Sequence, residues 1–246
     1  MQFRIKPYLF AALGLATMLT AASASWAAVV IEGTRIIYPA KTREITVRMI
    51  NKGDKPVLMQ TWADTGNEKS QPDTADAPFI ITPPIFRLDP QKGQSVRIVF
   101  TGSELPADRE SLFWFNTLEV PAMPDAATPA YMQIAIRSRL KLFYRPASLE
   151  GGSQDAAEKI TWSMARDKSG PALRGDNPTP FHISLGKVRL NNGGSIHEAD
   201  VGMIPPFGSA LFGLKTAPRP APAAKVDFGW ISDFGGMVEK SSPLQP

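Results

Sequence analysis

The chain has 246 residues, with 27 basic and 23 acidic side chains, and 43% of its residues are hydrophobic. This composition excludes a disordered chain, and the small positive charge gives no reason to expect a nucleic-acid partner. Because the sequence contains no cysteine, disulfides, thiolate metal sites and cysteine nucleophiles are excluded as well.

Residues 1–27 have the pattern of an export signal. Arg4 and Lys6 precede an apolar run of 12 residues, 8–19, and Ser25-Trp26-Ala27 satisfies the small-x-small rule for cleavage after Ala27. A membrane anchor is the alternative, but the apolar run is shorter than the roughly 20 residues that span a bilayer. Since the segment holds two basic and no acidic residues, cleavage would lower the net charge from +4 to +2.

The first half of the remaining chain predicts short β-strands separated by turns and loops. Apolar and polar residues alternate with period two in Ile45 to Met49, as is typical of a half-buried strand. Leu112 to Val120 is apolar on both faces, as expected of a central strand. This strand density is that of an immunoglobulin-like sandwich. The predicted strands are 45–49, 57–62, 79–82, 95–100, 112–120 and 131–144, with a polar loop at 68–77 and a Pro/Ala loop at 121–130.

A linker at 145–152 leads to a second set of short apolar segments, which predicts another β-sandwich. The expected strands are 160–164, 181–185, 188–190, 211–214 and 226–231, and the proline-rich run 217–224 is expected to be a loop or an edge. The predicted organisation is therefore all-β, with a signal peptide (1–27) followed by two immunoglobulin-like domains, 28–147 and 148–246.

Enzyme motifs are absent from the sequence, including G-x-S-x-G, H-E-x-x-H, the Walker loop and G-x-G-x-x-G. His182 falls in a predicted strand and His197 in a turn-rich stretch, and neither has a neighbouring carboxylate pattern that would make it a metal ligand. Asp64, Glu110 and Asp233 could pair for acid–base chemistry, but no spacing selects a pair. We therefore predict no catalysis, no metal and no cofactor.

The segment 131–146 carries an apolar row on one strand face. Met132, Ile134 and Ile136 are two residues apart, so their side chains are about 7 Å from one another along the strand. The pattern by itself favours a half-buried strand whose apolar row faces its own core.

Seven segments, taken in order, resemble the periplasmic pilus-assembly chaperones, the PapD-like family of the chaperone–usher pathway. The likeness covers residues 28–238, and each segment alone is modest while the ordered set is specific. The segments are Gly33–Pro39, Thr82–Pro84, Glu110–Asn116, Leu140–Pro146, Asn177–Phe181, Met203–Phe207 and Ile231–Gly236.

The resemblance implies a boomerang of two domains with a cleft between them. It implies that Arg35 and Lys141 anchor the C-terminal carboxylate of a pilus subunit. It also implies that Met132, Ile134 and Ile136 form a donor row that fills the groove of that subunit, a partner whose own fold lacks a strand.

By the same resemblance, Glu110, Arg145 and Asp233 form an interdomain charge network. The partners implied are pilus subunits and an outer-membrane usher, in the periplasm. The short loop at 121–130 and the lack of cysteines resemble the short-loop branch of the family. The competing interpretations are an exported two-domain adhesion or carbohydrate-binding module and a secreted hydrolase.

The sequence leaves two features of the 131–144 segment undecided. The donor row occupies even positions and Lys141 an odd one, so either a bulge lies near Ser138, or Lys141 faces the cleft while the donor row faces outward. An exposed apolar row also predicts reversible self-association through the 131–144 edge when no subunit is bound.

Overall fold

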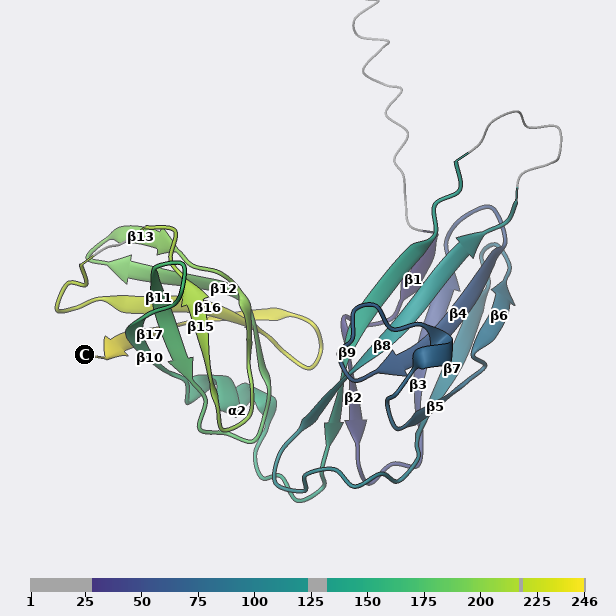
Figure 1. Ribbon diagram of the computed structural model, residues 1–246, viewed down its shortest axis with the longest axis horizontal. Helices are drawn as coiled ribbons and strands as arrows, with labels where there is room; N and C mark the ends of the chain where they lie inside the picture. Colours follow the sequence, from purple (N-terminus) through teal and green to yellow (C-terminus); the bar gives the residue numbers. More distant parts are fainter. Residues whose placement is uncertain (1–27, 124–131, 217–218, 246) are drawn as a thin grey trace, which may run out of the picture.

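The computed structural model describes residues 28–123, 132–216 and 219–245. The predicted signal peptide, Tyr131 and most of the 121–130 loop lie outside these ranges. Two β domains diverge from a connection beside the short helix α2 (Ser153–Glu158), so that the described chain forms a V (Figure 1). No helix within the described ranges is long and apolar enough to cross a membrane.

The N-terminal domain is a sandwich of two sheets. The four-stranded sheet has the order β1-β3-β7-β5, and the five-stranded sheet has the order β2-β9-β8-β4-β6. Their strands are β1 (Val29–Ile31), β2 (Arg35–Pro39), β3 (Ile45–Asn51), β4 (Val57–Asp64), β5 (Phe79–Thr82), β6 (Ile85–Leu88), β7 (Gly93–Phe100), β8 (Ser111–Pro121) and β9 (Ile136–Arg145). The 65–78 connection carries a short 3-10 helix, η2 (Pro72–Thr74).

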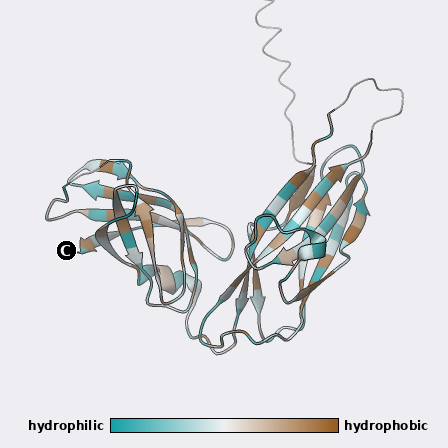
Figure 2. Cartoon of the chain, in the orientation of Figure 1, coloured by the Kyte–Doolittle hydropathy of each residue, from teal (hydrophilic) through white to brown (hydrophobic). Residues whose placement is uncertain are grey.

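Period-two alternation accounts for the N-terminal core. Val47 and Met49 on β3 and Val96 and Ile98 on β7 are buried, while the residues between them are largely exposed. The same alternation appears as changing hydropathy along the strands in Figure 2. Phe115 on the central strand β8 is fully buried and completes the layer between the two sheets.

The C-terminal domain is built from β10 (Thr161–Arg166) to β17 (Met237–Gln245). Its strands run in the order β13-β12-β16-β17-β10-β11-β15, and β14 pairs with β12. Because β17 pairs with both β16 and β10, it connects the two halves of this domain. Trp162, Phe212 and Phe228 fill its core. The intervening strands are β11 (Pro171–Asp176), β12 (Ile183–Asn192), β13 (Ser195–Glu198), β14 (Gly202–Ile204), β15 (Ser209–Gly213) and β16 (Lys225–Ile231).

The predicted strand from Tyr131 to Tyr144 is too long at its start. The ladder between β8 and β9 ends at the pair Glu119 and Ile136, and residues 132–135 are not part of a strand. Pro121, near which the ladder would continue, has no backbone N–H, and its carbonyl instead accepts a hydrogen bond from the Gln133 side chain at 2.6 Å. The segment therefore leaves the sheet without a partner strand.

Other differences have local causes. The predicted strands 181–185 and 188–190 form one strand, β12, with a register shift between Leu185 and Lys187. A Cβ on the intervening Gly186 would lie 3.1 Å from Ile231, so a glycine suits this irregularity. His197 lies in the short strand β13, and His182 immediately precedes β12. Sequence periodicity missed strands too short or too irregular for it, namely β1, β2, β6, β11, β13, β14 and β17, and the six-residue helix α2.

Candidate functional site

Two cations lie opposite each other where the five-stranded sheet faces the C-terminal domain. Arg35 begins β2 and pairs in parallel register with Lys141 on β9. The Arg35 guanidinium donates to the Ile231 carbonyl oxygen at 2.8 Å, and the Lys141 ammonium donates to the Ser184 hydroxyl at 2.9 Å. Both contacts cross between the domains, so the pair lies in the angle of the V.

Both cations are partly desolvated, and neither donates a hydrogen bond to a carboxylate of the residues that the structure describes. Burial lowers the pKa of Lys141, and the positive charge of Arg35 lowers it further. Burial also lowers the pKa of Arg35, against the opposing charges of Asp233 and Glu110. Within the described ranges the Arg35 Nε atom is buried with no hydrogen-bond partner. The pair therefore places two partly buried positive charges, and one unpaired N–H of Arg35, side by side.

The apolar row at Met132, Ile134 and Ile136 is exposed. These residues are 85%, 62% and 40% exposed, whereas Leu140 and Leu142, further along the segment, are buried in the core. The interpretation that the row faces its own core is therefore wrong. Only Ile136 lies within β9, and Met132 and Ile134 precede the strand, where the ladder with β8 has ended.

The strand register also shows whether a bulge lies near Ser138 and which face of β9 carries Lys141. Pairing between β8 and β9 runs from Tyr144 back to Ile136 without a shift, so no bulge lies at Ser138. Successive side chains alternate faces. Lys141, Phe143 and Arg145 contact the C-terminal domain, while the even positions Leu140 and Leu142 face the sandwich interior. The bulge is therefore excluded. Lys141 faces the cleft, and Ile136, at an even position, lies on the opposite face of β9.

The predicted interdomain charge network is assembled around Arg145. Arg145 Nε donates to Glu110 Oε1 at 2.8 Å, and its two terminal nitrogens donate to the two oxygens of Asp233 at 2.8 and 3.1 Å. Glu110 is buried, and its other oxygen accepts the backbone N–H of His182 at 2.8 Å. A crevice of about 10 Å³ remains beside this network, which is room for about one water.

The electrostatics of the network favour its charged form. Burial alone would raise the pKa of Asp233, but the hydrogen bonds and charge of Arg145 outweigh it and hold that pKa below its ordinary value. Burial opposes the charge on Arg145, yet Asp233 and Glu110 together raise its pKa. Glu110 and Asp233 thus meet through one arginine rather than as an acid–base pair, and Asp64 belongs to a separate cluster.

Comparison with known proteins matches both domains of the chain to one family. The family model described as "Pili and flagellar-assembly chaperone, PapD N-terminal domain" matches residues 28–150, and "Pili assembly chaperone PapD, C-terminal domain" matches residues 155–242. The chain belongs to the PapD family of pilus-assembly chaperones. The resemblance inferred from the sequence is confirmed.

The relatives of this PapD-family chaperone are similar over nearly their full length. A probable fimbrial chaperone, YadV, of Escherichia coli (strain K12) is 40% identical over 95% of this chain and 96% of its own. The chaperone protein FimB/FhaD of Bordetella pertussis is 43% identical over 93% of each chain. The crystal structure of the YadV chaperone superimposes with a TM-score of 0.76, at 39% identity, over 89% of this chain and 100% of that one.

A structure of the SafB chaperone with the Salmonella enterica SafA pilin is also similar. It has a TM-score of 0.74 and 27% identity, and it covers 90% of this chain and 99% of that one. Two immunoglobulin-like sandwiches are therefore the fold of this PapD-family chaperone, as the strand pattern predicts.

Sequence reasoning missed a buried polar cluster that holds the start of β9 in this chaperone. Asp64 is fully buried and accepts hydrogen bonds from Arg139 at 2.9 Å and from the Asn116 amide at 2.7 Å. The Asn116 carbonyl oxygen in turn accepts from Arg137 at 2.7 Å and from Arg139 at 3.1 Å. The cluster ties β4, β8 and β9 together at Arg137 and Arg139, immediately after the last donor residue, Ile136.

Aromatic rings extend this cluster across the outer face of the sheet. The Arg137 guanidinium lies 4.9 Å from the centre of the Trp62 ring, and the Arg139 guanidinium lies 4.6 Å from that of Trp114. The signal that would have found the cluster is the run of basic residues at alternate positions 137, 139 and 141. Cations at alternate positions share one strand face and need a counter-charge, which Asp64 provides for Arg137 and Arg139.

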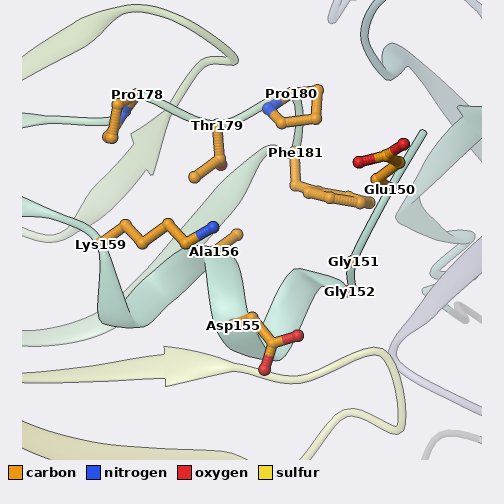
Figure 3. A pocket seen from close by; sticks show the side chains of 10 residues that line it. All are labelled: Glu150, Gly151, Gly152, Asp155, Ala156, Lys159, Pro178, Thr179, Pro180 and Phe181. Carbon is orange, nitrogen blue, oxygen red and sulfur yellow. The ribbon is translucent and has the colours of Figure 1, made fainter.

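A pocket of about 210 Å³ lies between α2 and the loop 178–181, and neither Arg35 nor Lys141 lines it. Figure 3 shows Lys159 reaching in from one side and the Phe181 ring lining the other, with Asp155 on α2 pointing away. Its loop is held by Asn177, whose amide donates to the carbonyls of Phe181 and Pro205. Within the described ranges, no group of three or more His, Asp or Glu side chains is arranged to hold a metal ion.

Proposed function

We propose that this protein is an exported periplasmic chaperone that binds, folds and caps pilus subunits by donating a strand, and that it delivers them to an outer-membrane usher. It acts as a binding protein rather than an enzyme. The observation that carries the proposal is the exposed apolar row of Met132, Ile134 and Ile136 leading directly to the cation pair of Arg35 and Lys141.

The free edge of β9 supports strand donation. β2 pairs with β9 from Lys141 to Arg145. Residues 136–140 pair with β8 on one side, and no strand among the described residues pairs with them on the other. An added strand on that open edge would complete its unpaired backbone hydrogen bonds. A client strand can therefore be added to this edge without any rearrangement of the chaperone's own sheet.

The position of β2 determines where an added strand must end. A client strand on the open edge would lie in line with β2 and would meet Arg35, the first residue of β2. Running parallel to β9, as β2 does, it would present its C-terminal carboxylate to Arg35 and Lys141. Charge-assisted hydrogen bonds to these groups contribute about 1.5–3 kcal/mol each.

The donor row supplies most of the affinity in this proposal. Burying three large apolar side chains in a client groove contributes roughly 5–9 kcal/mol before ordering costs. The anchor contributes register, because a one-residue slip would turn every donor side chain away from the groove. Apolar burial and a fixed carboxylate position together would define one docking arrangement.

Co-purification of a pilus subunit tests the proposal. We expect Arg35→Ala and Lys141→Ala each to leave a folded protein that no longer retains subunits, because the client carboxylate loses a donor. Arg48→Ala is the matched control, since Arg48 is an exposed cation on the other sheet of the same domain. Normal subunit recovery with either anchor variant would refute the anchor.

A further inference from the structure

Glu119 on β8 is a buried carboxylate with no role in the proposed subunit site. It is 7% exposed, and its neighbours in register are Met59 on β4 and Ile136 on β9. Across residues 28–123, 132–216 and 219–245, no basic side chain forms a salt bridge with it. An ionised carboxylate at this depth is costly unless a cation lies close to it.

The Glu119 side chain reaches across the sandwich to the start of the first strand. Within the same ranges, the hydrogen bond that its carboxylate accepts comes from the Val29 backbone N–H, at 3.2 Å. Consecutive backbone nitrogens are at most about 3.7 Å apart, so the Ala28 nitrogen lies within about 7 Å of this oxygen. Ala28 is itself held in place, because its carbonyl oxygen accepts the Lys52 N–H at 2.6 Å.

We propose that Glu119 is the buried ion-pair partner of the amino terminus that cleavage after Ala27 creates. The inference rests on the proposed export of the chain. A signal peptidase would hydrolyse the Ala27–Ala28 bond with one water: the hydroxyl goes to the Ala27 carbonyl carbon, and the Ala28 nitrogen gains the hydrogen. That amine takes up a further proton at neutral pH and becomes an ammonium group.

The pair exists only after processing. Before cleavage the Ala28 nitrogen is an uncharged amide and cannot neutralise the carboxylate. After cleavage the ammonium and Glu119 link the four-stranded sheet, through β1, to the five-stranded sheet, through β8. Because Glu119 is paired with Ile136, this link lies at the end of the domain from which the donor row emerges.

Unfolding in urea tests the pair on the full processed chain. Mass spectrometry of the exported protein first establishes whether it begins at Ala28. A site-specific protease then releases two chains, one that begins at Ala28 and one with a single extra glycine before Ala28. Each chain is made both with Glu119 and with Glu119→Gln. We expect the glycine to lower the folding equilibrium constant about tenfold when Glu119 is present and less than about twofold in the glutamine variant. Glu32→Gln, an exposed control on the β1–β2 connection, should keep the full tenfold effect.

Acetylation of the Ala28 amine removes the charge without changing Glu119, so it should reproduce the tenfold loss even if the glutamine variant does not fold. The proposal is overturned by an acetylated chain of unchanged stability, by an equal glycine effect in both backgrounds, or by an exported chain that begins elsewhere. Subunit retention by the glycine-extended chain is expected to be intact, since Arg35 and Lys141 are unaltered. A failure of the subunit site is thereby distinguished from a failure of this pair.

Discussion

Arg145 and Asp233, which are 88 residues apart in the chain, form a two-point ion pair across the domain boundary, with Nη1–Oδ2 at 2.8 Å and Nη2–Oδ1 at 3.1 Å. A planar guanidinium that meets both carboxylate oxygens constrains direction as well as distance. Since Arg145 ends β9, the strand that carries Lys141, this pair links the angle between the domains to the position of the anchor.

Asp233→Asn should loosen the interdomain angle without unfolding either domain. The substitution removes a charge-assisted bidentate contact worth about 2 kcal/mol and leaves Arg145 with Glu110 alone. Small-angle scattering should report a broader distribution of interdomain distances. Asp176→Asn, in an exposed pair with Arg174, should leave the distribution unchanged. A rigid V in the Asp233 variant would contradict the assigned role.

Acid should weaken the same contact. The pKa of Asp233 lies below its ordinary value, so its pair with Arg145 stabilises the protein fully above the ordinary carboxyl pKa of about 4. That contribution is lost as the pH falls through the lower, folded-state pKa. The difference in thermal stability between the native protein and Asp233→Asn should therefore shrink between pH 7 and about pH 3. A constant difference would show that Asp233 is not the group titrating.

Lys141→Met should separate stability from function. Burial and the neighbouring Arg35 both make the Lys141 charge costly, so replacing it with an apolar side chain should leave stability unchanged or raise it by about 1 kcal/mol. Subunit retention should be lost in the same variant. Thermal melts and co-purification measure the two effects, with the exposed Lys215→Met as control. A strongly destabilised Lys141 variant would argue for a structural role instead.

Asp64→Asn should release the base of the donor segment. Arg139 and Arg137 would then lie against the sheet without their counter-charge, at a cost of about 3 kcal/mol. Hydrogen exchange should accelerate at residues 136–140 before it does elsewhere in the domain. Asp89→Asn, in an exposed pair, serves as the matched change. Unaltered protection of β9 would exclude a positioning role for the cluster.

Ile134→Asp should abolish self-association of the free protein. The row is exposed and borders an open strand edge, so two copies can cover each other's apolar side chains. Sedimentation velocity at increasing concentration measures this association, and it should be reversible in the unmodified protein. Ile196→Asp, at an exposed position on the C-terminal domain, should not change it. An identical profile for the Ile134 variant would reject the edge as the contact.

Much of the fold was predictable because alternation along a strand reports which side chains share a face. The segments 45–49, 57–62 and 95–100 all lie within observed strands, and both domains are β-sandwiches as expected. Short edge strands such as β6 and β14 carry too few residues for a period to be recognised. The basic residues at 137 and 139 indicate that a counter-charge is needed, but the sequence could not identify Asp64 as that charge, since the cluster comes from three strands distant in sequence.

By itself, the amino-acid sequence determined the all-β class, two domains and, through ordered motifs, the family. Tertiary structure alone decided that Met132, Ile134 and Ile136 are exposed while Leu140 and Leu142, at the same spacing along the segment, are buried. It also decided that Arg35 and Lys141 lie side by side and that Arg145 reaches Asp233. The physical reason is that a residue pattern specifies a face of a strand, whereas burial depends on where the opposing sheet and the neighbouring domain end.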